Sequence, residues 1–272
     1  MINALGIDLE EWYHICGVSL PVGVSHKHES RIVANTDRIL KILDTMRTKA
    51  TFFVLGCVAE KFPAVIAKIN KAGHEIASHG YEHIEIYRHT PDSFREDLNK
   101  SIEILQKITG QAVLGFRAPN FSLIEQTMWA VDILVDEGIK YDSSIFPIHH
   151  PRYGIASAPR VPYRLRQNLV EFPLSTIRLL GVNVPIGGGA YLRLWPYAFV
   201  KAAAEHLQKS SLPLNFYFHV WEIDSKQPRL KLPAMRSWSH YAGLQGAQDK
   251  FEKLLSHFQF APMSEVIERG RF

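Results

Sequence analysis

The chain has 272 residues, of which 46% are hydrophobic and 21% are charged, so it is long enough to bury a core of its own. No stretch approaches the ~20 consecutive apolar residues of a membrane span, which argues against a spanning protein. The formal net charge is +4, and the 31 basic residues are scattered rather than clustered, which argues against a nucleic-acid partner.

The two cysteines, Cys16 and Cys57, are too few for a disulfide framework and lack the paired spacing of a zinc-thiolate site. A metal site would therefore need histidine and carboxylate ligands. The N-terminal segment has no basic region followed by a long apolar run, so we expect no secretory signal and a cytoplasmic location.

Strands and helices are predicted to alternate along the first half of the chain. The hydrophobic spacing predicts strands at 2–9, 49–56, 74–79, 113–119 and 138–147, and helices at 35–46, 60–71, 92–108 and 125–137. Such alternation is typical of parallel strands joined by helices, in a doubly wound sheet or a barrel. In both folds the functional residues gather at the carboxyl ends of the strands.

The alternation stops near 148–192, a segment with five prolines that ends in IGGGAYLRLWP. Because it keeps apolar runs, we interpret it as an irregular insertion folded onto the barrel rather than a linker. A helix at 197–208, a strand at 214–220 and a helix at 245–257 are predicted to follow. We therefore predict one domain that spans residues 1–272.

The stretch ASHGYEH places His79 and His83 four residues apart. On a helix this spacing puts both imidazoles on one face, and in a loop it can curl round a cation, so either geometry could bring them to one metal. With 13 histidines in the chain, two ordinary surface histidines are an equally good explanation of the pair alone.

Carboxylates and two further basic residues follow other predicted strands. Asp8, Glu10 and Glu11 come at the end of the first strand, where a cation or a proton-transfer role would offset the cost of desolvating them, or where they simply face water. Arg117 ends another apolar strand and could hold a carboxylate through its rigid fork, or form a structural salt bridge. His219 could donate a proton, oriented by a neighbouring carboxylate, or simply pack beside Trp221.

Taken in order, the segments GIDLEEW, SHGYEH, GFRAPNFS, YDSSIFP and FYFHVWE resemble the five motifs of the polysaccharide deacetylases, the NodB-homology group of carbohydrate esterase family 4. The stretches IDLEEW, GGGAYLRLWPY and FHVWEID are similar to the subgroup associated with bacterial exopolysaccharide and exosortase gene clusters. The resemblance implies a distorted (β/α)7 barrel and metal-dependent removal of N-acetyl groups from an amino-sugar polymer.

The resemblance also implies a role for each matching residue. The divalent metal, usually zinc and sometimes cobalt or nickel, would be held by His79, His83 and Glu10, with Glu11 left open as a substitute for Glu10. Asp8 would act as the base, Arg117 would tether it, and His219 would protonate the leaving amine. The substrate-binding residues are predicted to be Tyr81, Pro119, Asn120 and Trp221, with a backbone N–H near Tyr81 or elsewhere in its loop stabilising the oxyanion.

Two other functions fit the same residues. One is the hydrolysis of a small amide or cyclic imide, which would need a narrow, closed pocket where a glycan needs an open groove. The other is a catalytically inactive carbohydrate- or metal-binding protein, because the spacing of Asp8, Glu10 and Glu11 departs from the two adjacent aspartates common in the family.

Overall fold

A computed structural model describes residues 1–14, 29–210, 212–270 and 272. Its strands are β1 (Asn3–Leu9), β2 (Thr51–Val54), β3 (Glu75–Ser78), β4 (Gly115–Phe116), β5 (Tyr141–Asp142), β6 (Tyr163–Arg166), β7 (Leu169–Glu171), β8 (Thr176–Leu179), β9 (Val182–Pro185), β10 (Asn215–His219) and β11 (Phe260–Ala261). Its α-helices are α1 (Ile32–Thr45), α2 (Gly56–Lys61), α3 (Pro63–Lys71), α4 (Pro91–Thr109), α5 (Ala130–Asp136), α6 (Gly189–Leu194), α7 (Tyr197–Lys209), α8 (Ala234–Tyr241), α9 (Ala247–His257) and α10 (Met263–Gly270). In the described residues, no helix is both long and apolar enough to cross a membrane.

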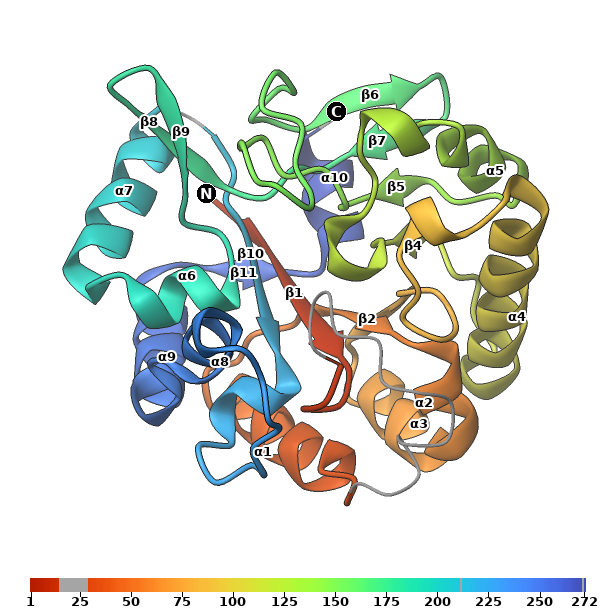
Figure 1. Ribbon diagram of the computed structural model, residues 1–272, viewed down its shortest axis with the longest axis horizontal. Helices are drawn as coiled ribbons and strands as arrows, with labels where there is room; N and C mark the ends of the chain where they lie inside the picture. Colours follow the sequence, from red (N-terminus) through yellow and green to blue (C-terminus); the bar gives the residue numbers. More distant parts are fainter. Residues whose placement is uncertain (15–28, 211, 271) are drawn as a thin grey trace.

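The described strands form a curled nine-stranded sheet in the order β10-β1-β2-β3-β4-β5-β7-β6, with β11 beside the start of β1. From β10 to β7 every neighbouring pair is parallel, and only β6 runs antiparallel, on the outer edge of β7. The helices lie around the outside of this sheet (Figure 1). The α/β fold predicted from the sequence, a distorted (β/α)7 barrel, is confirmed.

The ring of parallel strands meets itself at a seam between β10 and the segment that follows β7. There, the side-chain amide of Asn215 donates to the carbonyl oxygen of Phe172 at 2.7 Å. The backbone carbonyl of Asn215 accepts from the Ser175 N–H at 3.2 Å. Further along, the Tyr217 N–H donates to the Gly187 carbonyl at 3.1 Å. Individual hydrogen bonds thus join the two edges in place of a continuous strand ladder.

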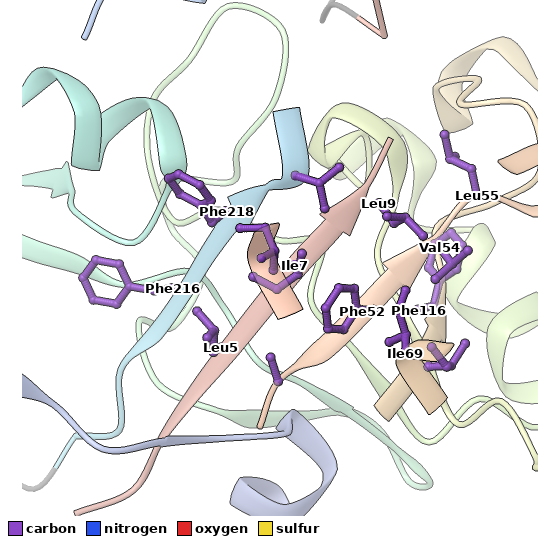
Figure 2. Close-up of a cluster of buried hydrophobic side chains, with 14 of the residues drawn as sticks. Leu5, Ile7, Leu9, Phe52, Val54, Leu55, Ile69, Phe116, Phe216 and Phe218 are labelled. Atoms are coloured by element: carbon purple, nitrogen blue, oxygen red, sulfur yellow. The ribbon is translucent and has the colours of Figure 1, made fainter. Parts of the chain in front are cut away.

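The side chains of β1 alternate between two packed environments, as the pleat of a strand requires. Leu5, Ile7 and Leu9 face the helices and pack with buried residues of β2 and β10, such as Phe52 and Phe218 (Figure 2). All five side chains are at most 1% exposed, and truncating a core residue of this kind to alanine costs about 2–5 kcal/mol.

The opposite face of β1 turns toward the inside of the barrel. Ala4 packs there with Phe53, Tyr141 and Phe172, so bulky side chains fill the lower part of the barrel. Because Asp8 lies on this same face, the strand carries its carboxylate to the open end of the interior.

The structure corrects several predicted boundaries. The helix predicted at 60–71 is two helices, because Phe62 adopts a non-helical backbone and Pro63 starts α3. Gly56, predicted to end a strand, begins α2, and the helix predicted at 125–137 shortens to α5 after a 3-10 turn.

The segment at 148–192 is more than an insertion. It contains the β8–β9 hairpin, but it also contains β7, which pairs in parallel with β5 and completes the ring of strands. The C-terminal tail adds β11 and α10, and β11 pairs with β1. The prediction of one domain over 1–272 stays a prediction.

Candidate active site

The carboxyl ends of β1, β3 and β10 open into a cavity of about 240 Å³. Asp8, Glu10, His79, His83 and His219 all line it, so residues that are far apart in the sequence meet in one place. The register explains part of this meeting, because Asp8 of β1 lies directly opposite His219 of β10.

Glu10, His79 and His83 form a cluster whose ligand atoms all lie within 4.8 Å of one another. The Nδ1 atom of His79 lies 2.7 Å from the carbonyl oxygen of Arg117, which can only accept, so Nδ1 carries the proton and Nε2 keeps its lone pair. Oε2 of Glu10 lies 2.7 Å from Nε2 of His83, yet it is buried without a hydrogen-bond partner among the described residues. Two imidazole nitrogens and one carboxylate oxygen are a donor set that fits a divalent cation.

The turn that carries both histidines is a loop rather than a helix. Gly80 has a φ of +76° and His83 a φ of +60°, and both values are incompatible with an α-helix. Positive φ costs little at glycine but strains a histidine, and such strain persists where the surroundings fix it. The four-residue spacing therefore brings the two imidazoles together by curling the loop.

Charge and burial set the protonation of this cluster. Burial alone would raise the pKa of the Glu10 carboxyl, but the imidazoles of His83, His219 and His79 hold that pKa well below its usual range. Burial lowers the pKa of His79 to about 4. An ionised carboxylate and a neutral imidazole are the forms that coordinate metals.

Asp8 is held by a fully buried arginine. The Arg117 guanidinium donates to Oδ1 of Asp8 at 2.7 Å, while its Nε and Nη2 donate to the carbonyl and hydroxyl oxygens of Ser143 at 3.0 and 2.9 Å. Its carbon centre also lies 4.0 Å from the ring centroid of Phe53. Arg117 therefore fixes one carboxylate oxygen of Asp8 and leaves Oδ2 on the side of His219, 3.9 Å from Nε2.

Gly6 leaves the space that this arginine occupies. A Cβ atom on Gly6 would lie 2.7 Å from Nη1 of Arg117, and the guanidinium has little freedom to move because three hydrogen bonds hold it. We expect Gly6→Ala to destabilise the protein by about 1–3 kcal/mol, as overpacking does, and to displace Arg117 from Asp8. Thermal unfolding measures this effect, with Gly246→Ala as the control because a Cβ atom at Gly246 would have no atom within 4 Å. Equal melting temperatures for the two variants would contradict the expectation.

His219 is held by a second buried ion pair. Its Nδ1 lies 2.6 Å from Oε1 of Glu222, and Oε2 of Glu222 lies 2.5 Å from Nε of Arg193. Burial alone would lower the pKa of His219, but the charges of Glu10, Glu222 and Asp8 raise it to about 9. The imidazole is therefore protonated at neutral pH and can give a proton away.

The pKa of His219 gives a prediction for the variant Glu222→Gln. A donor must be protonated, so activity is expected to fall as the pH rises through the pKa of His219. Removing the charge of Glu222 lowers that pKa, and we expect the alkaline limb of kcat to move to lower pH by about one unit. A pH–rate profile measures this, with Glu205→Gln on α7 as the exposed control; an unmoved limb would exclude His219 as the titrating donor.

Two parts of the chain match known protein families. Residues 28–135 match the polysaccharide deacetylase family, and residues 143–268 match a domain family of unknown function (DUF3473). The chain contains a polysaccharide deacetylase domain. His79, His83 and Arg117 lie in the first match and His219 in the second, whereas Asp8 precedes both.

The deacetylase domain has curated relatives and solved neighbours. It is 38% identical over 98 residues to a peptidoglycan-N-acetylglucosamine deacetylase of Bacillus cereus, a match that covers 36% of each chain. The chain spans about a third of the length of the curated relatives it matches. Among solved structures, its fold is similar to Puue allantoinase (TM-score 0.61, 18% identity, 97% and 88% coverage) and to a peptidoglycan N-acetylglucosamine deacetylase (TM-score 0.52, 20% identity, 97% and 86% coverage).

Ahead of the matched residues, Glu10 rather than Glu11 faces the two histidines. Glu11 accepts a hydrogen bond from the Arg31 N–H at 3.1 Å, at the start of α1, and it does not line the cavity. Burial raises the pKa of its carboxyl. Of the two glutamates that the sequence left open as ligands, the geometry therefore favours Glu10.

Two of the residues predicted to bind substrate, Tyr81 and Pro119, do not line this cavity. The backbone N–H of Tyr81 donates to Asp97 of α4 at 2.7 Å, and its hydroxyl donates to Glu60, so neither group serves the cavity. Pro119 is buried at the start of a 3-10 turn, η3 (Pro119–Phe121), and does not line the cavity either. Side-chain direction in these loops depends on packing against neighbouring helices, which the sequence does not display.

The other two predicted contacts, Asn120 and Trp221, do line the cavity. The side-chain amide of Asn120 donates to Glu85 at 3.1 Å, whereas its backbone N–H donates to no other backbone group in the described residues. Trp221 is stacked between the rings of His219 and His240, and its indole N–H lies 3.2 Å from Oε1 of Glu10. Trp221 therefore orients the site rather than offering an open face to a sugar.

Several cavity residues were not predicted. His14 lies two residues after the first motif, GIDLEEW, and was given no role. Ser143, which lies in the fourth motif, YDSSIFP, anchors Arg117. Tyr153 and Tyr191 come from the irregular segment at 148–192; Tyr191 lies in the stretch GGGAYLRLWPY but was given no role.

Proposed function

We propose that this protein is a metal-dependent hydrolase that removes N-acetyl groups from an amino-sugar polysaccharide or oligosaccharide and releases acetate. The observation that carries the proposal is the meeting of three groups in one cavity. These are the Glu10, His79 and His83 cluster, the Asp8 carboxylate held by Arg117, and His219 held by Glu222.

Glu10, His79 and His83 would hold the metal. A divalent cation bound there would lower the pKa of a water molecule and polarise the acetamide carbonyl. Mixed imidazole and carboxylate ligands suit zinc, which we propose as the native ion, with cobalt or nickel as alternatives.

Asp8 and His219 would transfer protons, and Asn120 would stabilise negative charge. Asp8 takes a proton from the attacking water through Oδ2, since Oδ1 is engaged with Arg117. His219 then protonates the nitrogen of the leaving amine, and Glu222 and Arg193 keep its imidazole oriented for that transfer. The backbone N–H of Asn120, which lines the cavity, would donate to the oxygen that becomes negative, in place of the backbone N–H predicted in the loop of Tyr81.

The surroundings of the cavity favour a glycan over a small amide or imide. A second cavity of about 890 Å³ shares the lining residues His150, Arg152 and Tyr153 with the first. A small amide would fill the first cavity alone, whereas a chain of sugars could occupy both. A catalytically inactive binding protein would not need two buried arginines that position Asp8 and Glu222.

One assay tests the proposal against both rivals. The purified protein, loaded in turn with Zn²⁺, Co²⁺ and Ni²⁺, is incubated with acetylated chitooligosaccharide, peptidoglycan fragments, an acetylated exopolysaccharide and allantoin. We expect metal-dependent acetate release from at least one of the glycans and no hydrolysis of allantoin. Hydrolysis of allantoin alone would favour the small-amide function, and metal binding without turnover would favour the binding protein.

Three further predictions stay open beside this proposal. They are the association with exopolysaccharide synthesis, the cytoplasmic location and the identity of the glycan. The oligomeric state is not predicted.

A further inference from the structure

His14 lies beside the cluster of Glu10, His79 and His83 and lines the same cavity. Its ring is stacked on that of His83, with centroids 5.3 Å apart and planes 14° apart. A third imidazole beside the two of this cluster invites the interpretation that it is a fourth ligand. The hydrogen bonds of His14 argue for a different role.

A short turn fixes the ring of His14 and its tautomer. The His14 N–H donates to the carbonyl of Glu11 at 2.9 Å, and the Glu11 N–H donates back to Nδ1 of His14 at 3.2 Å. A backbone N–H can only donate, so Nδ1 must present its lone pair to it. The imidazole therefore carries its proton on Nε2.

His79 has the opposite arrangement. There a carbonyl oxygen takes the Nδ1 proton and frees Nε2 to bind a metal, whereas in His14 Nε2 is the protonated nitrogen. A nitrogen that carries a proton has no lone pair for a cation. The ring of His14 thus presents an N–H group, and among the described residues this group has no hydrogen-bond partner.

We propose that His14 is a substrate-positioning residue, whose Nε2–H donates a hydrogen bond to an oxygen of the bound glycan, either a sugar hydroxyl or the acetamide carbonyl. The inference rests on the proposed deacetylase function. Because the donor is neutral and lies next to His83, it can orient an oxygen near the cation site without adding charge there. Stacking on His83 and the turn at Glu11 keep the ring in place before the substrate arrives.

Two substitutions test this role. His14→Ala removes the donor, whereas His14→Gln keeps an N–H at nearly the same distance from the backbone. For the alanine variant we expect kcat/KM on the best glycan to fall by roughly tenfold or more, the loss of about one hydrogen bond to substrate. We expect the glutamine variant to recover a clear part of this loss, which a purely structural role would not allow.

Direct Zn²⁺ titration by calorimetry separates positioning from ligation. Both variants are expected to bind one Zn²⁺ with the affinity of the unsubstituted protein and to melt at the same temperature, as is the surface control His206→Ala on α7. A lost or strongly weakened Zn²⁺ site in His14→Ala would make His14 a ligand and overturn the proposal, and so would unchanged kcat/KM in both variants. If the unsubstituted protein releases no acetate from any glycan, the proposed function fails instead, before the variants are compared.

Discussion

The variant His79→Ala is expected to lose metal binding and acetate release together. His79 supplies one of the two nitrogens in the cluster with Glu10, and its Nε2 is set for coordination by the hydrogen bond from Nδ1 to the Arg117 carbonyl. Loss of an outer-shell partner alone weakens metal sites by roughly 10- to 100-fold, so loss of a ligand should weaken this site by more than about 100-fold. Zn²⁺ titration and acetate release, measured on the same preparation, check the result.

The control for this variant is His257→Ala, which removes an exposed histidine of α9. It should bind metal and turn over normally. Retention of stoichiometric Zn²⁺ by His79→Ala, with turnover intact, would show that the cluster is not the metal site. Retention of the metal with turnover lost would contradict only the assignment of His79 as a ligand.

Asp8→Asn is expected to keep the metal and lose the reaction. Asparagine has the same shape and its carbonyl oxygen can still accept from Arg117, but it cannot take a proton from water. General-base catalysis contributes roughly 100- to 10,000-fold to rate, so kcat should fall by about that factor. Zn²⁺ stoichiometry and initial rates measure the two effects separately.

The comparison variant is Glu10→Gln, which should lose both the metal and the activity because Glu10 belongs to the ligand cluster. Breaking a buried ion pair costs about 3–5 kcal/mol, and Asp8→Asn removes the charge opposite Arg117, so its melting temperature should fall. Normal turnover by Asp8→Asn would exclude Asp8 as the base.

The sequence was sufficient where hydrophobic spacing and strand ends decide the structure. It placed β1, β3 and β10 and predicted that polar residues at their carboxyl ends would meet, and Asp8, His79 and His219 do line one cavity. Parallel strands explain this success, because their carboxyl ends share one edge.

The sequence was insufficient where contacts between residues distant in the chain decide the structure. β7 has three residues and follows several prolines, so no periodicity could mark it, and only its pairing with β5 makes it a strand of the barrel. The backbone N–H of Tyr81 is bound by Asp97 of α4 and its hydroxyl by Glu60 of α2, two contacts that the local sequence does not show. Likewise, Glu10 and Glu11 are neighbours in the sequence. Their side chains point to different places because Glu11 accepts a hydrogen bond from the N–H of Arg31, just before α1.

The seam between β7 and β10 divides the rim of the barrel into a stiff part and an adjustable part. Asp8 and His219 face each other across the continuous ladder of β1 and β10, so any change in their spacing would break that ladder. On the other side of β10, separate hydrogen bonds such as those of Asn215 replace a ladder, so the join to the wall built from 148–192 has fewer bonds to break. Ligands of different girth could thus be admitted while base and acid stay at one fixed separation.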